Sequence, residues 1–295
     1  MAQFDYVAAT SIDEAVKALV GAPSAKVLAG GTDLIVQMRA GRVRPGAVVD
    51  VKRVPGAVGI RRETDGGYVI GAATSGAAIG EHTALARDWP GVVEATCLIG
   101  STQVQGRASM GGNLCNASPA ADSVPALISA RATGVIVGPS GRREVPVEAI
   151  QVGPGRTSLQ PGEFLLEFRL PPRPKRAADA YLRLIPRTEM DIAVVGAGVN
   201  LVLGADGVVV EAYVALGAVA PTTLLVADAG AALVGGSLDA ASLARLDAAA
   251  EFEAAVRDAC TPISDKRGTA EYRTHIAGVL ARRAAKIAYD RAKVR

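Results

Sequence analysis

The stretches Leu28-Ala-Gly-Gly-Thr-Asp-Leu-Ile35 and Ser109-Met-Gly-Gly-Asn-Leu-Cys-Asn-Ala-Ser-Pro-Ala-Ala-Asp122 decide which fold and which function this chain is expected to have. Each stretch places two adjacent glycines beside hydroxyl and amide side chains. If the two stretches converge, their backbone N–H groups would form a concave site suited to a pyrophosphate. A dinucleotide cofactor is therefore the first prediction from the sequence.

The first stretch follows a short predicted strand, residues 26–29, and precedes a helix expected to run from Thr32 or Asp33 to Arg39. Its amides and the Thr32 hydroxyl would bind phosphate, although a tight turn with an N-cap residue explains the same pattern. The spacing is neither G-x-G-x-x-G nor that of a phosphate-binding P-loop. Gly196-Ala-Gly198 lies inside an alternating strand, where close packing explains its small residues.

The second stretch predicts an irregular loop that is unusually rich in hydrogen-bonding side chains, because it contains Asn113, Asn116, Ser118 and Asp122. Buried polar groups require partners, and a bound polar ligand would supply them. Asp122 could cap the following helix or accept hydrogen bonds from ligand hydroxyls or a ring N–H. Cys115 is interpreted as a small buried residue, since no histidine is near it in the sequence.

The composition excludes several other kinds of site. The chain has 295 residues, which is enough for about two domains of typical length. Of these residues, 49% are apolar. Its formal net charge of +3 is not concentrated in one block, which argues against nucleic-acid binding. The two histidines lie far apart and the three cysteines form no CxxC pair, so zinc, iron–sulfur and catalytic-triad sites are poorly supported.

The chain shows no signal peptide after Met1 and no apolar run near the ~20 residues of a membrane span. These features predict a cytoplasmic protein without a transmembrane segment. Any association with a membrane is expected only through a larger complex.

The predicted elements change character near the proline-rich, basic segment 170–176. Before it, strands and helices alternate, beginning with a capping box at Ser11 and Glu14. After it, three alternating strands predict an antiparallel sheet, with Ala205-Asp-Gly207 as a hairpin turn. Helices are expected over residues 237–246, 249–259 and 269–293. The predicted class is α+β.

These residues resemble a known family, the FAD-binding medium subunit of the molybdenum hydroxylases. That group includes xanthine dehydrogenase, aldehyde oxidoreductases and aerobic carbon monoxide dehydrogenase. Ala29 to Leu34 is similar to the first flavin loop of the family, and Ser109 to Asn113, continuing to Asp122, is similar to the second. The resemblance extends to the C-terminal motifs Arg187-Thr-Glu-Met-Asp-Ile-Ala193, Asp265-Lys-Arg-Gly268 and Glu271-Tyr-Arg273.

The resemblance implies an FAD-binding fold of the vanillyl-alcohol oxidase type over residues 1–176, with subdomains of about 1–56 and 57–176. A small α/β domain over 177–295 would follow it. FAD would lie extended, with its pyrophosphate between the two glycine stretches. The residues implied to contact it are Leu28, Ala29, Gly30, Gly31, Thr32, Asp33, Leu34, Ile35, Thr74, Ile99, Ser109, Met110, Gly111, Gly112, Asn113, Asp122, Leu165 and Arg183.

The resemblance also implies a function and partners. A large subunit would bind molybdopterin, and a small subunit would carry two two-iron two-sulfur clusters, in a dimer of heterotrimers. Electrons would pass through FAD to NAD, oxygen or a quinone, with no catalytic acid, base, nucleophile or metal ligand in this chain. Two alternatives remain: a stand-alone flavin reductase or oxidase on the same fold, and a scaffold that has lost its flavin.

Overall fold

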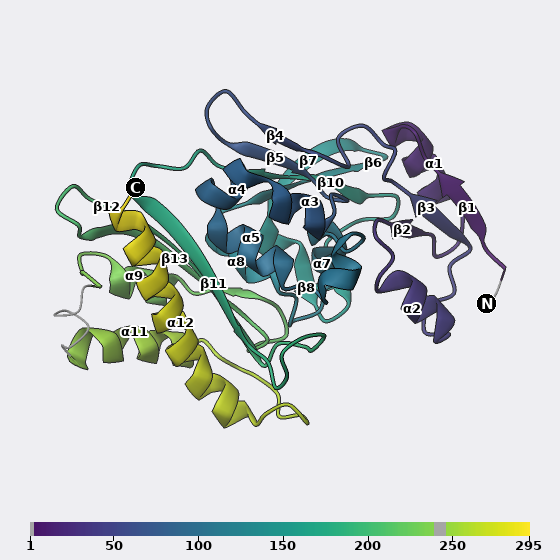
Figure 1. The fold of residues 1–295 in the computed structure, drawn as a ribbon. Coiled ribbons are helices and arrows are strands. Elements are labelled where there is room, and N and C mark those ends of the chain that lie inside the picture. The colour runs from purple at the N-terminus through teal and green to yellow at the C-terminus, as the bar shows by residue number, and fades with distance from the viewer. Residues whose placement is uncertain (1–2, 239–245) are drawn as a thin grey trace.

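The computed structural model describes residues 3–238 and 246–295, and it arranges them in three units (Figure 1). The N-terminal unit is a parallel sheet in the order β1-β3-β2, formed by β1 (Asp5–Ala8), β2 (Lys26–Leu28) and β3 (Ala47–Asp50). Two helices connect its strands, α1 (Ile12–Gly21) and α2 (Leu34–Arg39). The predicted succession of strand, helix, strand, helix, strand is confirmed.

Local sequence explains the start of α1. The Ser11 hydroxyl accepts the amide N–H of Glu14 at 3.1 Å, as the capping box predicts. The Glu14 carboxylate, however, binds the N–H and hydroxyl of Thr10 and not the amide of Ser11. Ala15 is buried, but Val20, which the helical periodicity places on the same face, is 61% exposed.

The central unit is an antiparallel five-stranded sheet in the order β4-β5-β10-β6-β7. Helices cover it on the side that faces the lower half of Figure 1, and their buried side chains form one core with Tyr68, Ile70 and Phe168 of the sheet. The strands are β4 (Ile60–Arg62), β5 (Tyr68–Gly71), β6 (Thr133–Gly138), β7 (Gly141–Pro146) and β10 (Phe164–Leu170). The α-helices are α3 (Gly76–Glu81), α4 (Thr83–Asp88), α5 (Pro90–Cys97), α6 (Thr102–Gln105), α7 (Met110–Cys115) and α8 (Ser123–Ser129). A short 3-10 helix, η1 (Val147–Ala149), and the pair β8 (Gln151–Gly153) and β9 (Arg156–Thr157) complete the unit.

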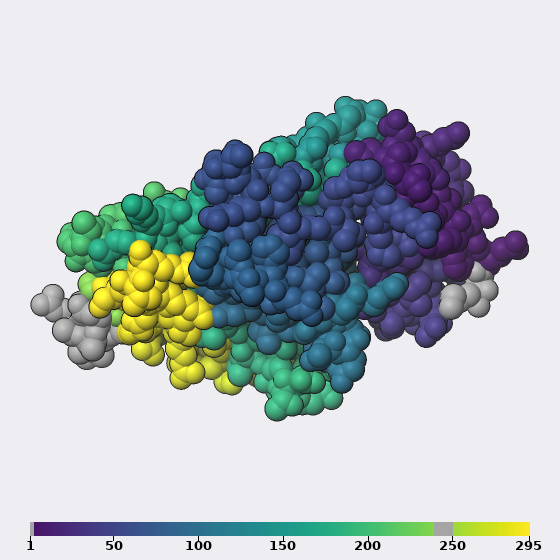
Figure 2. All heavy atoms as spheres, turned by 45° about the horizontal axis from the view of Figure 1, so that its top comes forward, coloured from purple at the N-terminus to yellow at the C-terminus, as the bar shows by residue number. Residues whose placement is uncertain are grey.

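The C-terminal unit is an antiparallel sheet, β11-β12-β13-β14, packed against helices that include the long α12. Its elements are β11 (Ala177–Leu184), β12 (Val195–Leu203), β13 (Val209–Gly217), β14 (Leu224–Leu225), α9 (Ala227–Leu233), α11 (Leu246–Asp258) and α12 (Ala270–Lys293). Gly207 has a φ of +84° in the predicted hairpin turn. The helix predicted over 237–246 lies almost entirely outside the described residues. Figure 2 shows this unit and the N-terminal residues at opposite ends of an elongated molecule.

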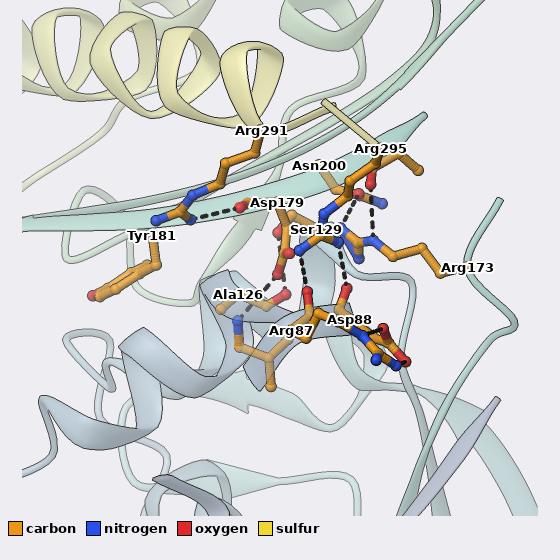
Figure 3. Close-up of polar contacts among 12 residues, drawn as sticks. Arg87, Asp88, Ala126, Ser129, Arg173, Asp179, Tyr181, Asn200, Arg291 and Arg295 are labelled. Carbon is orange, nitrogen blue, oxygen red and sulfur yellow. Dashed lines mark hydrogen bonds and ion pairs between the residues drawn. The ribbon is translucent and has the colours of Figure 1, made fainter. Parts of the chain in front are cut away.

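Charged side chains, some buried and some partly exposed, join the C-terminal unit to α5 (Figure 3). The Asp179 carboxylate accepts the amide N–H of Val92 at 3.1 Å, which caps a helix that has no side-chain cap of its own. Its other oxygen accepts from the Arg173 guanidinium at 2.8 Å, and that guanidinium lies over the Trp89 ring. Arg291 of α12 donates to the carboxylate of Glu94 in α5.

These elements confirm the α+β class. Among the described residues, the structure contains no helix with the length and apolarity needed to cross a membrane.

Candidate cofactor site

The two glycine stretches meet at a cavity of about 770 Å³ between the N-terminal and central units. Their approach is so close that a Cβ on Gly30 would lie 1.7 Å from the carbonyl oxygen of Arg107, just before the second stretch. Gly31 has a φ of +78°, in the left-handed region that favours glycine. Gly30 is therefore required by the convergence of the two segments, and Gly31 by its left-handed backbone conformation.

The two glycines of the second stretch, Gly111 and Gly112, have different roles. A Cβ on Gly111 would lie 2.5 Å from the carbonyl oxygen of Ala72, so this glycine allows the segment to pack on the central sheet. A Cβ on Gly112 would have only the Ser109 hydroxyl within 4 Å, at 3.2 Å. Because Gly112 also lines the cavity, its missing side chain leaves space there that a ligand can occupy.

The prediction that residues 109–122 form one irregular loop is wrong over the first half. Residues 110–115 form the helix α7, because the Ser109 hydroxyl accepts the Gly112 amide at 3.1 Å and caps the helix. The Gly111 amide donates to Ala72 and the Asn113 amide donates to Ser109. The amides of residues 111, 112 and 113 are thus already bonded within the protein.

In the first glycine stretch, by contrast, the backbone N–H groups of residues 30–34 have no hydrogen-bond partner anywhere in the described part of the chain. Consecutive unpaired N–H groups in a turn form an anion-binding concavity, and here they border the cavity. We call these five groups the amide nest. Its donors fit a pyrophosphate, so the residues present suit a dinucleotide.

The nest is held and tuned by charged neighbours. The Lys52 ammonium group donates to the carbonyl of Ala29 at 2.8 Å and to the Asp50 carboxylate at 2.7 Å, which fixes the start of the nest. Asp33 lines the cavity but makes no side-chain cap bond with α2. Burial raises the pKa of Asp33.

Twelve of the predicted site residues line the cavity: Ala29, Gly30, Gly31, Thr32, Asp33, Leu34, Ile99, Ser109, Gly111, Gly112, Asn113 and Leu165. Cys115 lines it too, and burial raises the pKa of its thiol to about 12, so that the thiol is not a nucleophile.

Six other predicted residues do not line the cavity. Leu28, Ile35 and Met110 pack into apolar clusters, while the Thr74 hydroxyl pairs with the backbone of Gly59. The remaining two, Asp122 and Arg183, bind each other.

Asp122, Arg183 and Tyr181 form a buried cluster behind the cavity wall. The Arg183 guanidinium and the Tyr181 hydroxyl donate to the two oxygens of Asp122 at 2.7 and 2.9 Å. The next residue, Ser123, donates to the side-chain oxygen of Asn113, which lines the cavity. Burial raises the pKa of Asp122 to about 6, although Arg183 and Tyr181 both oppose the shift.

A pH-dependent stability difference is expected from this cluster. Because the folded pKa of Asp122 is about 6 against 3.8 for the free side chain, the folded state favours the protonated acid. This contribution is complete below about pH 4 and is lost as the pH rises through 6. The unfolding free energy of the wild type, minus that of Asp122→Asn, should therefore fall by about 2 kcal/mol between pH 4 and 7. Urea titrations at several pH values measure it, and a constant difference would contradict the expectation.

Two segments that line the cavity were not predicted from the sequence. One is the end of α1 with the start of β2, and the other is the segment from Gly155 to Phe164. Gly155 and Pro161-Gly162 signal turns, but their residue types carry no ligand chemistry. Only the tertiary packing brings them to the glycine stretches.

Comparisons with known proteins cover nearly the whole chain. Residues 2–173 match the family model described as the FAD binding domain in molybdopterin dehydrogenase. Residues 180–288 match the CO dehydrogenase flavoprotein C-terminal domain.

Among similar proteins, the carbon monoxide dehydrogenase medium chain of Afipia carboxidovorans is 38% identical, over 98% of both chains. The putative xanthine dehydrogenase FAD-binding subunit XdhB of Escherichia coli is 31% identical, covering 92% of this chain and 91% of that protein. Among solved structures, a chain of the cyanide-inactivated Cu,Mo-CO dehydrogenase matches with a TM-score of 0.91 and 35% identity, over 98% of both chains.

Proposed function

Because this chain belongs to the family of FAD-binding medium subunits of molybdenum hydroxylases, we propose that it passes electrons from an iron–sulfur partner through FAD to an external acceptor. The acceptor would be NAD, oxygen or a quinone. The amide nest is the observation that carries the proposal, since five unpaired donors at a cavity suit a pyrophosphate.

FAD supplies the redox chemistry, because a flavin exchanges electrons both singly and in pairs. The residues of this chain would bind and orient it. The nest would hold the pyrophosphate, and the open space at Gly112 would admit it close to the backbone. Ile99 and Leu165 would contact the isoalloxazine, and Asp122 with Arg183 would set the charge behind the cavity wall.

The partners follow from the family. We propose a large molybdopterin-binding subunit and a small subunit with two two-iron two-sulfur clusters, assembled as a dimer of heterotrimers.

Reconstitution of the purified full-length chain with FAD tests the cofactor assignment. We expect one FAD per chain after gel filtration, seen in the visible absorption of the flavin. A chain that stays colourless would refute FAD binding. Co-purification from the native host tests the assembly: a large chain that contains molybdenum supports the proposed role. A flavin-loaded chain that elutes alone and oxidises substrate by itself would favour the stand-alone enzyme.

A further inference from the structure

The segment that carries the amide nest is held to the rest of the protein by few contacts. It covers residues 30–45, beginning with the nest and containing α2, and we call it the α2 segment. Met38 is the one buried residue of α2. The backbone hydrogen bonds of the segment are local, such as that from the Ile35 amide to the carbonyl of Gly31. Figure 1 shows α2 below the small parallel sheet, at the edge of the molecule.

Both ends of the α2 segment are fixed. The Lys52 ammonium group holds the carbonyl just before the nest. Just after the segment, the amide of Gly46 donates to the carbonyl of Pro23 at 3.0 Å. Gly31 and Gly41, one on each side of α2, have φ values of +78° and +70°. Glycines at such positions can absorb the backbone rotation of a hinge.

One hydrogen bond ties the middle of the α2 segment to the central unit. The Gln37 side-chain amide donates to the side-chain oxygen of Asn116 at 2.9 Å. Among the described residues, it is the only hydrogen bond that residues 30–45 form outside their own segment. Both side chains line the cavity, one from each of the two units that enclose it. The bond therefore runs from one wall of the cavity to the other.

Asn116 is the fixed half of this pair. It ends α7, where its amide donates to the carbonyl of Gly112 at 2.9 Å. The carbonyl of the next residue, Ala117, accepts the amide of Gly155 at 2.9 Å. Gln37, in contrast, lies on a segment with no second polar tie among the described residues, so it is the half that can move away.

We propose that the Gln37–Asn116 hydrogen bond is a clasp, which closes the α2 segment over bound FAD and slows its release; the inference rests on the proposed function. When the clasp opens, α2 turns about the two flanking glycines and uncovers the cavity. When it closes, the amides of Asp33 and Leu34 stay against the phosphate oxygens. One hydrogen bond contributes modestly to a binding free energy, so the clasp acts mainly on the rate of release.

The release of FAD from the loaded, full-length chain tests the clasp. Flavin fluorescence after dilution follows the release in the wild type, Gln37→Ala, Asn116→Ala and the double variant. Each single variant should release FAD about fivefold faster, the effect of one lost hydrogen bond. Because both substitutions break the same bond, the double variant should also release it about fivefold faster, and not about 25-fold.

Val36→Ala is the matched control, since Val36 lies on α2, is 61% exposed and does not line the cavity. Its variant should release FAD at the wild-type rate. Wild-type release rates in both Gln37→Ala and Asn116→Ala, or a double variant that multiplies the two single effects, would overturn the clasp.

Trypsin digestion of the flavin-free chains tests the clasp without the cofactor. Arg39 and Arg42 are exposed trypsin sites within the α2 segment. Cleavage there should be about fivefold faster in Gln37→Ala and Asn116→Ala than in the wild type and Val36→Ala, because it depends on how often the segment opens. Equal cleavage rates in all four chains would contradict the inference. If the wild type binds no FAD, the proposed function fails, and these cleavage rates alone decide whether the clasp exists.

Discussion

Replacing Gly112 with valine is expected to lower the affinity for FAD about a hundredfold, equivalent to about 2.7 kcal/mol. A Cβ at this position meets only the Ser109 hydroxyl, so the added methyl groups would extend into cavity space. The fold should survive, because Gly112 lies in α7 without a positive φ, and valine is no worse a helix former than glycine. Flavin content after reconstitution measures the loss of FAD affinity, and a thermal melt shows whether the fold survives.

Gly106→Val is the matched control for this prediction. Gly106 also lies near a helix, at the end of α6, with no atom within 4 Å of an added Cβ, and it does not line the cavity. Its variant should keep wild-type FAD affinity. Full FAD occupancy in Gly112→Val would show that the pyrophosphate does not lie beside this residue.

Replacing Asp179 with alanine is expected to lower the free energy of unfolding by about 3–5 kcal/mol. Asp179 is buried, caps the start of α5 and pairs with Arg173, whose side chain is buried too. Burial raises the pKa of Asp179, while Arg173 and the backbone donors oppose that shift. Alanine would leave the guanidinium and the helix amides without their acceptor. Urea denaturation followed by circular dichroism measures the loss.

Two further variants separate the loss of the hydrogen-bond acceptor from the loss of charge, and a buried ion pair from an exposed one. Asp179→Asn keeps an oxygen acceptor for the helix amides but removes the negative charge, so its loss should be smaller. Asp290→Ala removes one partner of the exposed pair with Lys286 on α12 and should cost less than about 1 kcal/mol. If Asp179→Ala unfolds no more easily than Asp290→Ala, the buried contacts contribute little to stability.

Much of the architecture could be predicted because its signals are local. The Ser11 cap, the hairpin at Gly207 and the alternation of β11 to β13 depend on neighbouring residues. The convergence of the glycine stretches was expected from the family resemblance, which implies a pyrophosphate between them. That the amides of residues 30–34 lack partners in the described part of the chain, while those of residues 111–113 are bonded, could not be predicted. It depends on which amides are already bonded, as at Gly111 and Ala72, which only the tertiary structure decides.

The unpredicted parts of the site depend on contacts between distant segments. Val20 belongs to the apolar periodicity of α1, which predicts burial in the core, but packing turns it toward the cavity. Leu159 and Pro161 contribute only shape. Similarly, Asp122 and Arg183 suggested ligand contacts, yet in the structure they satisfy each other. Sequence patterns report local preference and do not specify such partners.

The cap on α5 has a consequence for how the chain folds as it is made. The acceptor of the Val92 amide, Asp179, lies 87 positions later in the chain, and the partner of Glu94, Arg291, lies 197 positions later. As the protein emerges from the ribosome, α5 therefore stays incomplete until the C-terminal unit has been synthesised and docked. Because α5 leads directly to Ile99 at the cavity, the cofactor cavity should mature late, after translation has passed both units.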